Sequence, residues 1–226
     1  AAFIAGVDPY ADAETWHNFI ITNYMLPNNI TANRVYALSY GADTQDVADA
    51  FNEGVFLGSY FGHATTTGGW GSPVFGYTDI DNLTNAQLYP FLVNFSCSSA
   101  GIHYVGSLGC NEKWMTVANK GAASAYGTTR ELEPYAWSTW GNLYLFLFQA
   151  LYTDGTRELG PLCHAADLLF VAYYGTSDPV SRDFVEEFVI HGDPSMALPA
   201  PPEPPLGNYL IVAASSYVNS TPLNQL

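Results

Sequence analysis

Short apolar runs alternate along the chain with longer stretches of helical periodicity. The apolar runs predict strands at residues 2–7, 34–38, 54–61, 90–96, 121–126 and 184–190. The helical spacing predicts helices at about 14–26, 43–53, 110–119, 136–152 and 158–174. Strands that alternate with helices are typical of an α/β fold with a mostly parallel sheet.

The chain divides into one domain, a linker and a short final segment. Its 226 residues are enough for a single domain with a sizeable core. Because the chain opens directly on an apolar run with no signal peptide, we expect a trimmed or processed chain. Prolines concentrate after the last predicted strand. We therefore expect a domain over 1–198, a Pro-rich linker over 199–207, and an extra strand or a permuted or truncated segment over 208–226.

Reactive side chains directly follow three of the predicted strands. Asp8 follows the first strand, His63 follows the strand at 54–61, and Cys97 follows the strand at 90–96. In an open parallel sheet, ligands gather outside the carboxyl ends of the strands. If these strands are neighbours, a carboxylate, an imidazole and a thiol meet at one edge of the sheet.

These three groups are the set that thiol catalysis requires. An imidazolium lowers the pKa of a nearby thiol, and the resulting thiolate can attack a carbonyl carbon. The imidazole can then protonate the leaving amine, while a carboxylate on its other nitrogen fixes its orientation. Backbone N–H groups in the adjacent Gly-rich turns can hold the oxyanion. The alternative interpretation is a structural cysteine at a strand end beside a capped histidine.

Composition narrows the classes of function. Six Lys and Arg residues against twenty-one Asp and Glu residues give a formal net charge of −15. This balance excludes a basic nucleic-acid footprint and argues against docking on anionic membranes. No run approaches the roughly 18 apolar residues that a membrane span needs. An acidic, lysine-poor and aromatic-rich chain suits an extracellular or cell-surface bacterial protein.

The cysteines and histidines do not form a disulfide framework or a metal site. Three cysteines leave at least one free thiol, and we expect Cys110 and Cys163, in or near helices, to be packing residues. The other histidines lack metal-ligand spacing, and the sequence has no H-E-x-x-H, paired C-x-x-C, G-x-S-x-G or P-loop motif. We therefore expect no cofactor.

Two segments around the ends of predicted strands carry distinctive motifs. Residues 55–64 read Val-Phe-Leu-Gly-Ser-Tyr-Phe-Gly-His-Ala, and residues 90–97 read Pro-Phe-Leu-Val-Asn-Phe-Ser-Cys. The first segment resembles the catalytic-histidine motif of the gingipain family of cysteine peptidases, and the second resembles the nucleophile motif of the same family. Residues 107–114, 120–129 and 191–195 agree with the same family. The resemblance runs over about residues 1–198. It implies a three-layer α/β/α sandwich with a caspase-like fold and a Cys/His endopeptidase.

The resemblance also implies a role for each catalytic position. Cys97 takes the place of the nucleophile and His63 that of the general acid and base. Asp8 falls where the family has a glutamate that orients the histidine. Ala64 replaces the glycine that usually follows the histidine, and its N–H remains available, with that of Cys97, for an oxyanion hole.

Substrate-binding residues follow from the same resemblance. Glu14 falls where arginine-specific members keep a carboxylate in the S1 pocket, Trp137 resembles a tryptophan of the pocket wall, and Tyr135 is a neighbouring candidate. A buried carboxylate would favour a basic P1 residue. Alternatively, Glu14 only complements the dipole at the start of a helix. The resemblance also allows for a bound structural calcium ion, although the sequence has no calcium-binding motif.

Three functions are compatible with the sequence and the resemblance. The first is a cysteine endopeptidase that hydrolyses protein or peptide substrates. The second is a catalytically silent caspase-like binding module of a larger secreted protein. Ala64 favours this alternative, as do the truncated start and the missing α/β subdomain that the family usually has before this region. The third is transfer of the acyl group to an amine instead of water. Nothing in the sequence predicts the oligomeric state.

Overall fold

Six strands and the helices between them follow the order that the hydrophobic pattern predicts. The computed structural model describes residues 1–7, 12–65, 69–103, 107–131 and 137–202. The strands are β1 (Ala2–Ala5), β2 (Asn33–Tyr36), β3 (Leu57–Phe61), β4 (Ala64–Thr65), β5 (Gly69–Gly71), β6 (Val74–Phe75), β7 (Phe91–Phe95), β8 (Ser124–Thr128) and β9 (Phe188–His191). The α-helices are α1 (Asp12–Ile20), α2 (Ala37–Tyr40), α3 (Thr44–Asn52), α4 (Tyr77–Asn82), α5 (Cys110–Thr116), α6 (Trp137–Tyr152), α7 (Leu159–Tyr174) and α8 (Pro179–Glu187). A π-helical turn, η1 (Ile21–Met25), and a 3₁₀ turn, η2 (Leu26–Asn28), continue α1.

The central sheet has the order β2-β1-β3-β7-β8-β9. All neighbouring strands run parallel except β9, which is antiparallel to β8. Every residue of β1, β3, β7 and β8 is buried, as expected for parallel strands covered on both faces. The mostly parallel sheet is therefore confirmed. A second, small antiparallel sheet of β4, β5 and β6 follows β3 and was not predicted.

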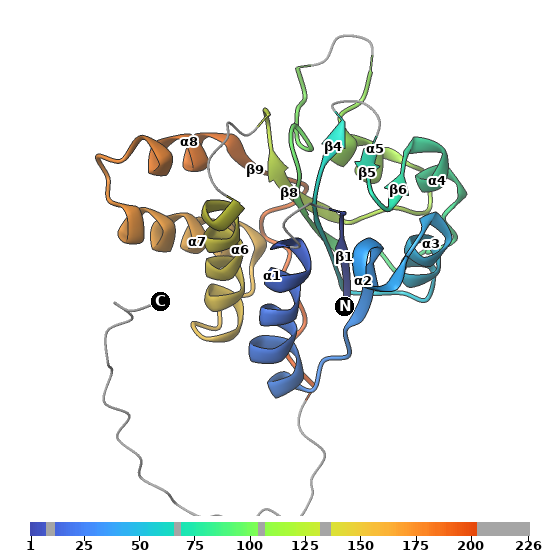
Figure 1. Ribbon diagram of the computed structural model, residues 1–226, viewed down its shortest axis with the longest axis horizontal. Helices are drawn as coiled ribbons and strands as arrows, with labels where there is room; N and C mark the ends of the chain where they lie inside the picture. Colours follow the sequence, from blue (N-terminus) through green and yellow to red (C-terminus); the bar gives the residue numbers. More distant parts are fainter. Residues whose placement is uncertain (8–11, 66–68, 104–106, 132–136, 203–226) are drawn as a thin grey trace, which may run out of the picture.

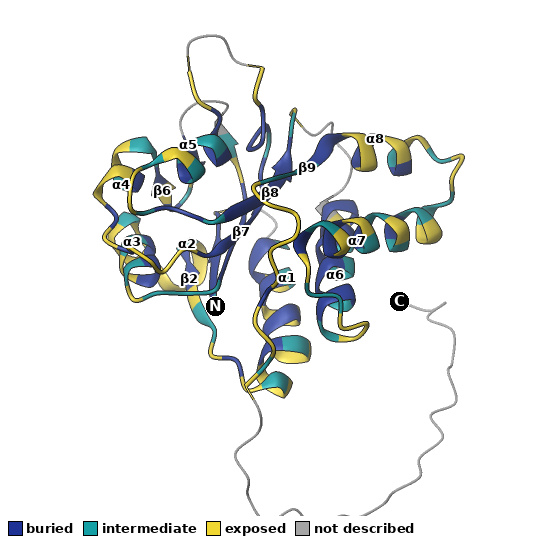
Figure 2. Cartoon of the chain, turned by 180° about the vertical axis from the view of Figure 1, so that it is seen from behind, coloured by how far each residue is buried: buried dark blue, intermediate teal, exposed yellow. Residues whose placement is uncertain are grey.

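Helices cover both faces of the central sheet (Figure 1). One face packs against α1, α6, α7 and α8, and the other against α3, α4 and α5. Side chains alternate between the faces along each strand, so that Phe61 lies in the first core and Tyr60 in the second. The buried sheet lies between helices whose outer faces are exposed (Figure 2). The three-layer α/β/α sandwich is confirmed.

The predicted strand at 184–190 was wrong at its start, because residues 179–187 form α8. Asp178 caps this helix by accepting a hydrogen bond from the N–H of Val180 at 2.9 Å, and proline occupies its first position. The helix buries Phe184, which stacks on Phe170 of α7 with ring centroids 4.7 Å apart. The apolar run therefore serves first as the buried side of a helix and then as the edge strand β9.

Two further predictions concern the final segment of the chain and the absence of a membrane span. The strand expected within 208–226 lies outside the described residues. Among the described residues, no helix combines the length and the apolar character needed to cross a membrane.

Candidate active site

His63 and Cys97 lie at the same level of the carboxyl edge of the sheet. Phe61, the last residue of β3, is paired in register with Phe95, the last residue of β7. His63 and Cys97 each follow two residues later. The N–H of Gly62 donates to the carbonyl oxygen of Phe95 at 3.2 Å, which extends the pairing beyond both strands. Since neighbouring strands lie about 4.8 Å apart, the two chain segments leave the sheet side by side.

The two side chains differ in exposure. Cys97 is half-buried and packs against the apolar core between the sheet and α6, whereas His63 is exposed. The Cys97 side chain is therefore partly open to solvent, and the His63 side chain is open to it. Both residues follow paired strand ends at one edge of the sheet, and their catalytic roles stay a prediction.

The strand that precedes Asp8, β1, ends at the same edge of the sheet. Ala5, the last residue of β1, is paired with Phe61, and the N–H of Gly6 donates to the carbonyl oxygen of Phe61 at 3.0 Å. The chain after β1 therefore leaves the sheet next to the segment that carries His63. Asp8 itself lies outside the described residues.

The backbone of His63 is held from two directions. Its carbonyl oxygen accepts hydrogen bonds from the hydroxyl of Tyr60 at 2.6 Å and from the N–H of Gly71 at 2.9 Å. The bond from Gly71 belongs to the antiparallel pairing of β4 with β5, in which Ala64 is opposite Trp70. Because hydrogen-bonded and non-bonded pairs alternate in such a ladder, the N–H of Ala64 points away from β5.

The turn that carries Cys97 is held by the end of β8. The N–H of Ser98 donates to the carbonyl oxygen of Arg130 at 2.8 Å, and the N–H of Ala100 donates to that of Thr128 at 2.8 Å. Ser98 has a φ of 53°, a left-handed conformation that is uncommon for a residue other than glycine. Strained backbone of this kind persists where surrounding contacts enforce it, often beside a functional group.

A buried network of polar side chains joins the end of β7 to the turn that carries Cys97. Asn94 in β7 accepts a hydrogen bond from the hydroxyl of Ser96 at 2.6 Å and donates to the Oδ1 of Asn111 at 2.9 Å. The hydroxyl of Ser99 donates to the carbonyl oxygen of Asn94 at 3.1 Å. All four residues are fully buried. A connected buried network of this kind fixes local geometry, and the sequence signal for it was the pair of polar residues, Asn94 and Ser96, inside an apolar strand run.

The predicted substrate-binding residues are only partly described. Glu14 lies in the first turn of α1 and is 7% exposed. Its carboxylate accepts hydrogen bonds from the N–H of Ser39 at 2.9 Å and from the hydroxyl of the same residue, so it joins α1 to α2. Trp137 begins α6, but its side chain and the whole of Tyr135 lie outside the described residues.

The other two cysteines are buried, as expected. Desolvation raises the pKa of Cys110 to about 12, and burial also raises the pKa of Cys163 above its ordinary value. Both thiols therefore stay protonated near neutral pH and lie away from solvent. Of the three cysteines, all of which lie within the described residues, Cys97 is half-buried and the other two are buried.

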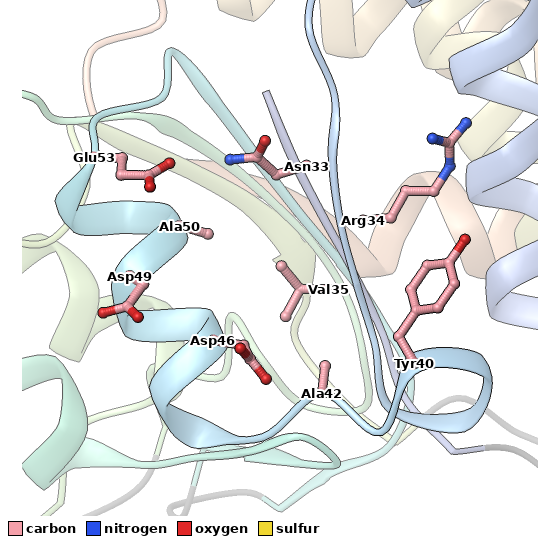
Figure 3. Close-up of a pocket in the computed structure, with 9 residues that line it drawn as sticks. All are labelled: Asn33, Arg34, Val35, Tyr40, Ala42, Asp46, Asp49, Ala50 and Glu53. Atoms are coloured by element: carbon pink, nitrogen blue, oxygen red, sulfur yellow. The ribbon is translucent and has the colours of Figure 1, made fainter.

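A hollow of about 410 Å³ lies away from these residues, between α3 and the edge strand β2 (Figure 3). Its lining carries the carboxylates of Asp46 and Asp49 on α3 and of Glu53, which directly follows this helix, beside the apolar Val35 and Ala50. Since no cysteine or histidine lines it, this hollow does not contain the predicted chemistry. Within the described ranges, no group of three or more His, Cys, Asp or Glu side chains is arranged to hold a metal ion. The structural calcium ion stays a prediction from the resemblance.

The chain is similar to known cysteine peptidases in sequence. It is 30% identical over 93 residues to gingipain R2 of Porphyromonas gingivalis, an alignment that covers 41% of this chain and 12% of that protein. It is also 30% identical over 86 residues to gingipain R1 of the same organism, covering 38% of this chain and 8% of the relative. The matched region is thus a small part of the length of these curated relatives.

Solved structures and a family model agree with this similarity. The Arg-specific cysteine proteinase gingipain R (RgpB) superposes with a TM-score of 0.70 at 20% identity, covering 88% of this chain and 46% of that one. A structure described only as a protease superposes with a TM-score of 0.72 at 16% identity, covering 88% and 48%. The sequence model of peptidase family C25 matches residues 1–199. Because this match includes most of the chain, the chain belongs to peptidase family C25.

Proposed function

We propose that this chain is the catalytic part of a cysteine endopeptidase, with Cys97 as nucleophile and His63 as general acid and base. The register of β3 with β7 carries the proposal, because it brings both residues two positions beyond paired strand ends. Membership of a peptidase family supports the class of reaction. Protein or peptide substrates and an extracellular or cell-surface location are part of the same proposal.

The proposed reaction begins with attack of the Cys97 thiolate on the carbonyl carbon of the scissile bond. The displaced electron pair moves to the carbonyl oxygen, which the N–H groups of Ala64 and Cys97 stabilise. Collapse of this intermediate breaks the C–N bond, and His63 gives its proton to the leaving amine. The acyl group then remains on Cys97 as a thioester.

Hydrolysis of the thioester completes the cycle. His63 takes a proton from water, the hydroxide attacks the thioester carbon, and the thiolate leaves with its electron pair. Asp8 is proposed to orient the imidazole from its other nitrogen. The orientation of the Ala64 N–H away from β5 supports its place in the oxyanion hole.

A screen of peptide substrates tests the proposal. Wild type and Cys163→Ala should cleave the same peptides, whereas Cys97→Ala should lose cleavage by at least about a thousandfold. Cleavage that survives in Cys97→Ala would exclude Cys97 as the nucleophile. A wild type that cleaves no peptide would instead favour the silent binding module, which the presence of Ala64 after the histidine supports. Added amines that yield ligated product would indicate acyl transfer.

For specificity, we propose a preference for basic P1 residues, with Glu14 as the anchor and Trp137 and Tyr135 beside it. The carboxylate of Glu14 already accepts two hydrogen bonds from Ser39, so an incoming guanidinium or ammonium would share it. The net charge of −15 would also steer basic substrates toward the chain.

Two variants separate the roles of Glu14. Glu14→Gln removes the negative charge, while Ser39→Ala removes the hydroxyl contact and leaves the carboxylate in place. With P1 Arg, Lys, Asp and Leu peptides, Glu14→Gln should lose the preference for basic residues and Ser39→Ala should keep it. A preference that persists in Glu14→Gln would show that the carboxylate only joins α1 to α2.

A further inference from the structure

We propose that Tyr60 is a positioning residue for the reaction, because its hydroxyl fixes the backbone of His63 relative to Cys97. The inference rests on the proposed function of His63 as the base. It assigns a role to a side chain on the face of the sheet opposite to the core that contains Phe61.

The geometry places the hydroxyl of Tyr60 between two chain segments at the carboxyl edge. It donates to the carbonyl oxygen of His63 at 2.6 Å and lies 3.2 Å from that of Ser72. The N–H of Gly71 reaches the same carbonyl oxygen of His63 at 2.9 Å from the other side. The peptide group of His63 is therefore held between a side chain of β3 and the backbone of β5.

The ring of Tyr60 has no room to move. It is fully buried and stacks on Trp70, with ring centroids 4.4 Å apart and planes 7° from parallel. A Cβ at Gly62 would lie 2.7 Å from the hydroxyl oxygen, and a Cβ at Gly6 would lie 3.4 Å from it. The absence of a side chain at position 62 thus creates the space that the hydroxyl fills.

The hydroxyl is a permanent donor. Burial raises the pKa of Tyr60 well above its ordinary value, so the group stays protonated over the whole range in which a cysteine peptidase works. Loss of the hydroxyl would remove the shorter of the two hydrogen bonds that Tyr60 and Gly71 donate to the His63 carbonyl oxygen, and would let the imidazole move away from the thiol. Since an imidazolium lowers the pKa of a thiol only at close range, the thiolate fraction of Cys97 at acid and neutral pH would fall.

The pH dependence of Cys97 alkylation by iodoacetamide reports this effect without any substrate. The variant Tyr60→Phe removes the hydroxyl and keeps the ring. Tyr144→Phe is the matched control, because Tyr144 is equally buried and its hydroxyl bonds to Ser59 at 2.8 Å. Both variants are compared with wild type at a temperature where circular dichroism shows them to be folded.

The expected result is a specific shift. In Tyr144→Phe, the pH midpoint of Cys97 alkylation should equal that of wild type. In Tyr60→Phe, this midpoint should be higher by about 0.5–1 pH unit. Below the midpoint this shift corresponds to a roughly 3- to 10-fold slower reaction. Replacement of Tyr60 by p-aminophenylalanine, which keeps a donor at the same position, should restore most of the wild-type rate.

The outcomes distinguish the positioning role of Tyr60 from the proposed function of Cys97 and His63. An unchanged midpoint in Tyr60→Phe, with Cys97 still reactive in wild type, overturns the role of Tyr60 and leaves the proposed function intact. A wild type whose Cys97 reacts like an ordinary thiol overturns the proposed function itself. If Tyr60→Phe does not fold, a p-aminophenylalanine variant that is folded but has a raised midpoint overturns the role of Tyr60.

Discussion

Replacing Asp167 by asparagine should stabilise the protein at neutral and alkaline pH and leave its stability unchanged in acid. Asp167 lies on α7, where its Oδ1 accepts a hydrogen bond from the buried hydroxyl of Tyr126 at 3.3 Å. Desolvation raises the pKa of Asp167 from 3.8 to about 7. Asparagine keeps the shape and the acceptor for Tyr126 and removes the ionisation.

The magnitude follows from the difference in proton binding between the two states. The unfolded carboxyl loses its proton near pH 4 and the folded one near pH 7, so the folded state holds one more proton between these values. The stability from this group is fully present below pH 4 and is lost as the pH rises to 7. About three pH units correspond to roughly 4 kcal/mol, and partial exposure of the side chain reduces the expected effect to about 2–4 kcal/mol.

Urea unfolding between pH 4 and pH 8, followed by tryptophan fluorescence, gives the free energy of unfolding of both proteins. The difference between Asp167→Asn and wild type should be near zero at pH 4 and should rise to its full value above pH 7. Glu53→Gln, at an exposed position on the surface, is the control and should change the free energy of unfolding by less than about 0.5 kcal/mol. A difference that does not vary with pH, or a less stable variant at pH 8, would show that burial does not raise the pKa of Asp167.

Three further substitutions test other parts of the structure. Burial lowers the pKa of His17 to about 3, so wild type should lose stability as the pH falls below about 6.5. His17→Phe should resist this loss in the same urea titration. If the free energies of unfolding of both proteins fall in parallel with pH, His17 is not the cause of the loss. Gly127→Ala would place a Cβ against the hydroxyl of Ser99, and overpacking should cost about 1–3 kcal/mol in thermal melts, so an unchanged Tm would be inconsistent with this contact. Asn94→Ala leaves the hydroxyl of Ser96 without its acceptor and should cost about 2–3 kcal/mol by urea unfolding; a loss below about 0.5 kcal/mol would count against the network.

The mostly parallel character of the sheet and the edge that carries the candidate site could be predicted from local sequence patterns, whereas the order of the strands in the sheet was not predicted. Strands buried on both faces are continuous apolar runs, and this is why the segments around β3 and β7 were found to within three residues. His63 and Cys97 were predicted because reactive residues directly after strands in a parallel sheet share one edge. The length of the run at 184–190 could not distinguish a strand from the end of a helix, since both bury apolar side chains.

The supports of the site could not be predicted, because they depend on contacts between distant residues. The hydroxyl of Tyr60 meets Ser72 only after β4, β5 and β6 fold back. The carboxylate of Glu14 finds Ser39 twenty-five residues further on, and Asn94 meets Asn111 from the start of α5. A polar residue in an apolar run shows that some partner is required, but periodicity alone does not identify it.

Competitive alkylation of the native protein tests whether His63 activates Cys97. The protein reacts with limiting iodoacetamide at pH 6 beside glutathione as a reference thiol, and peptide mapping measures labelling of each cysteine. Cys97 should react about 10- to 100-fold faster than glutathione, Cys110 and Cys163 should stay unlabelled, and His63→Ala should remove the advantage of Cys97. If Cys97 reacts no faster than glutathione, or if its rate is unchanged in His63→Ala, His63 does not activate this thiol.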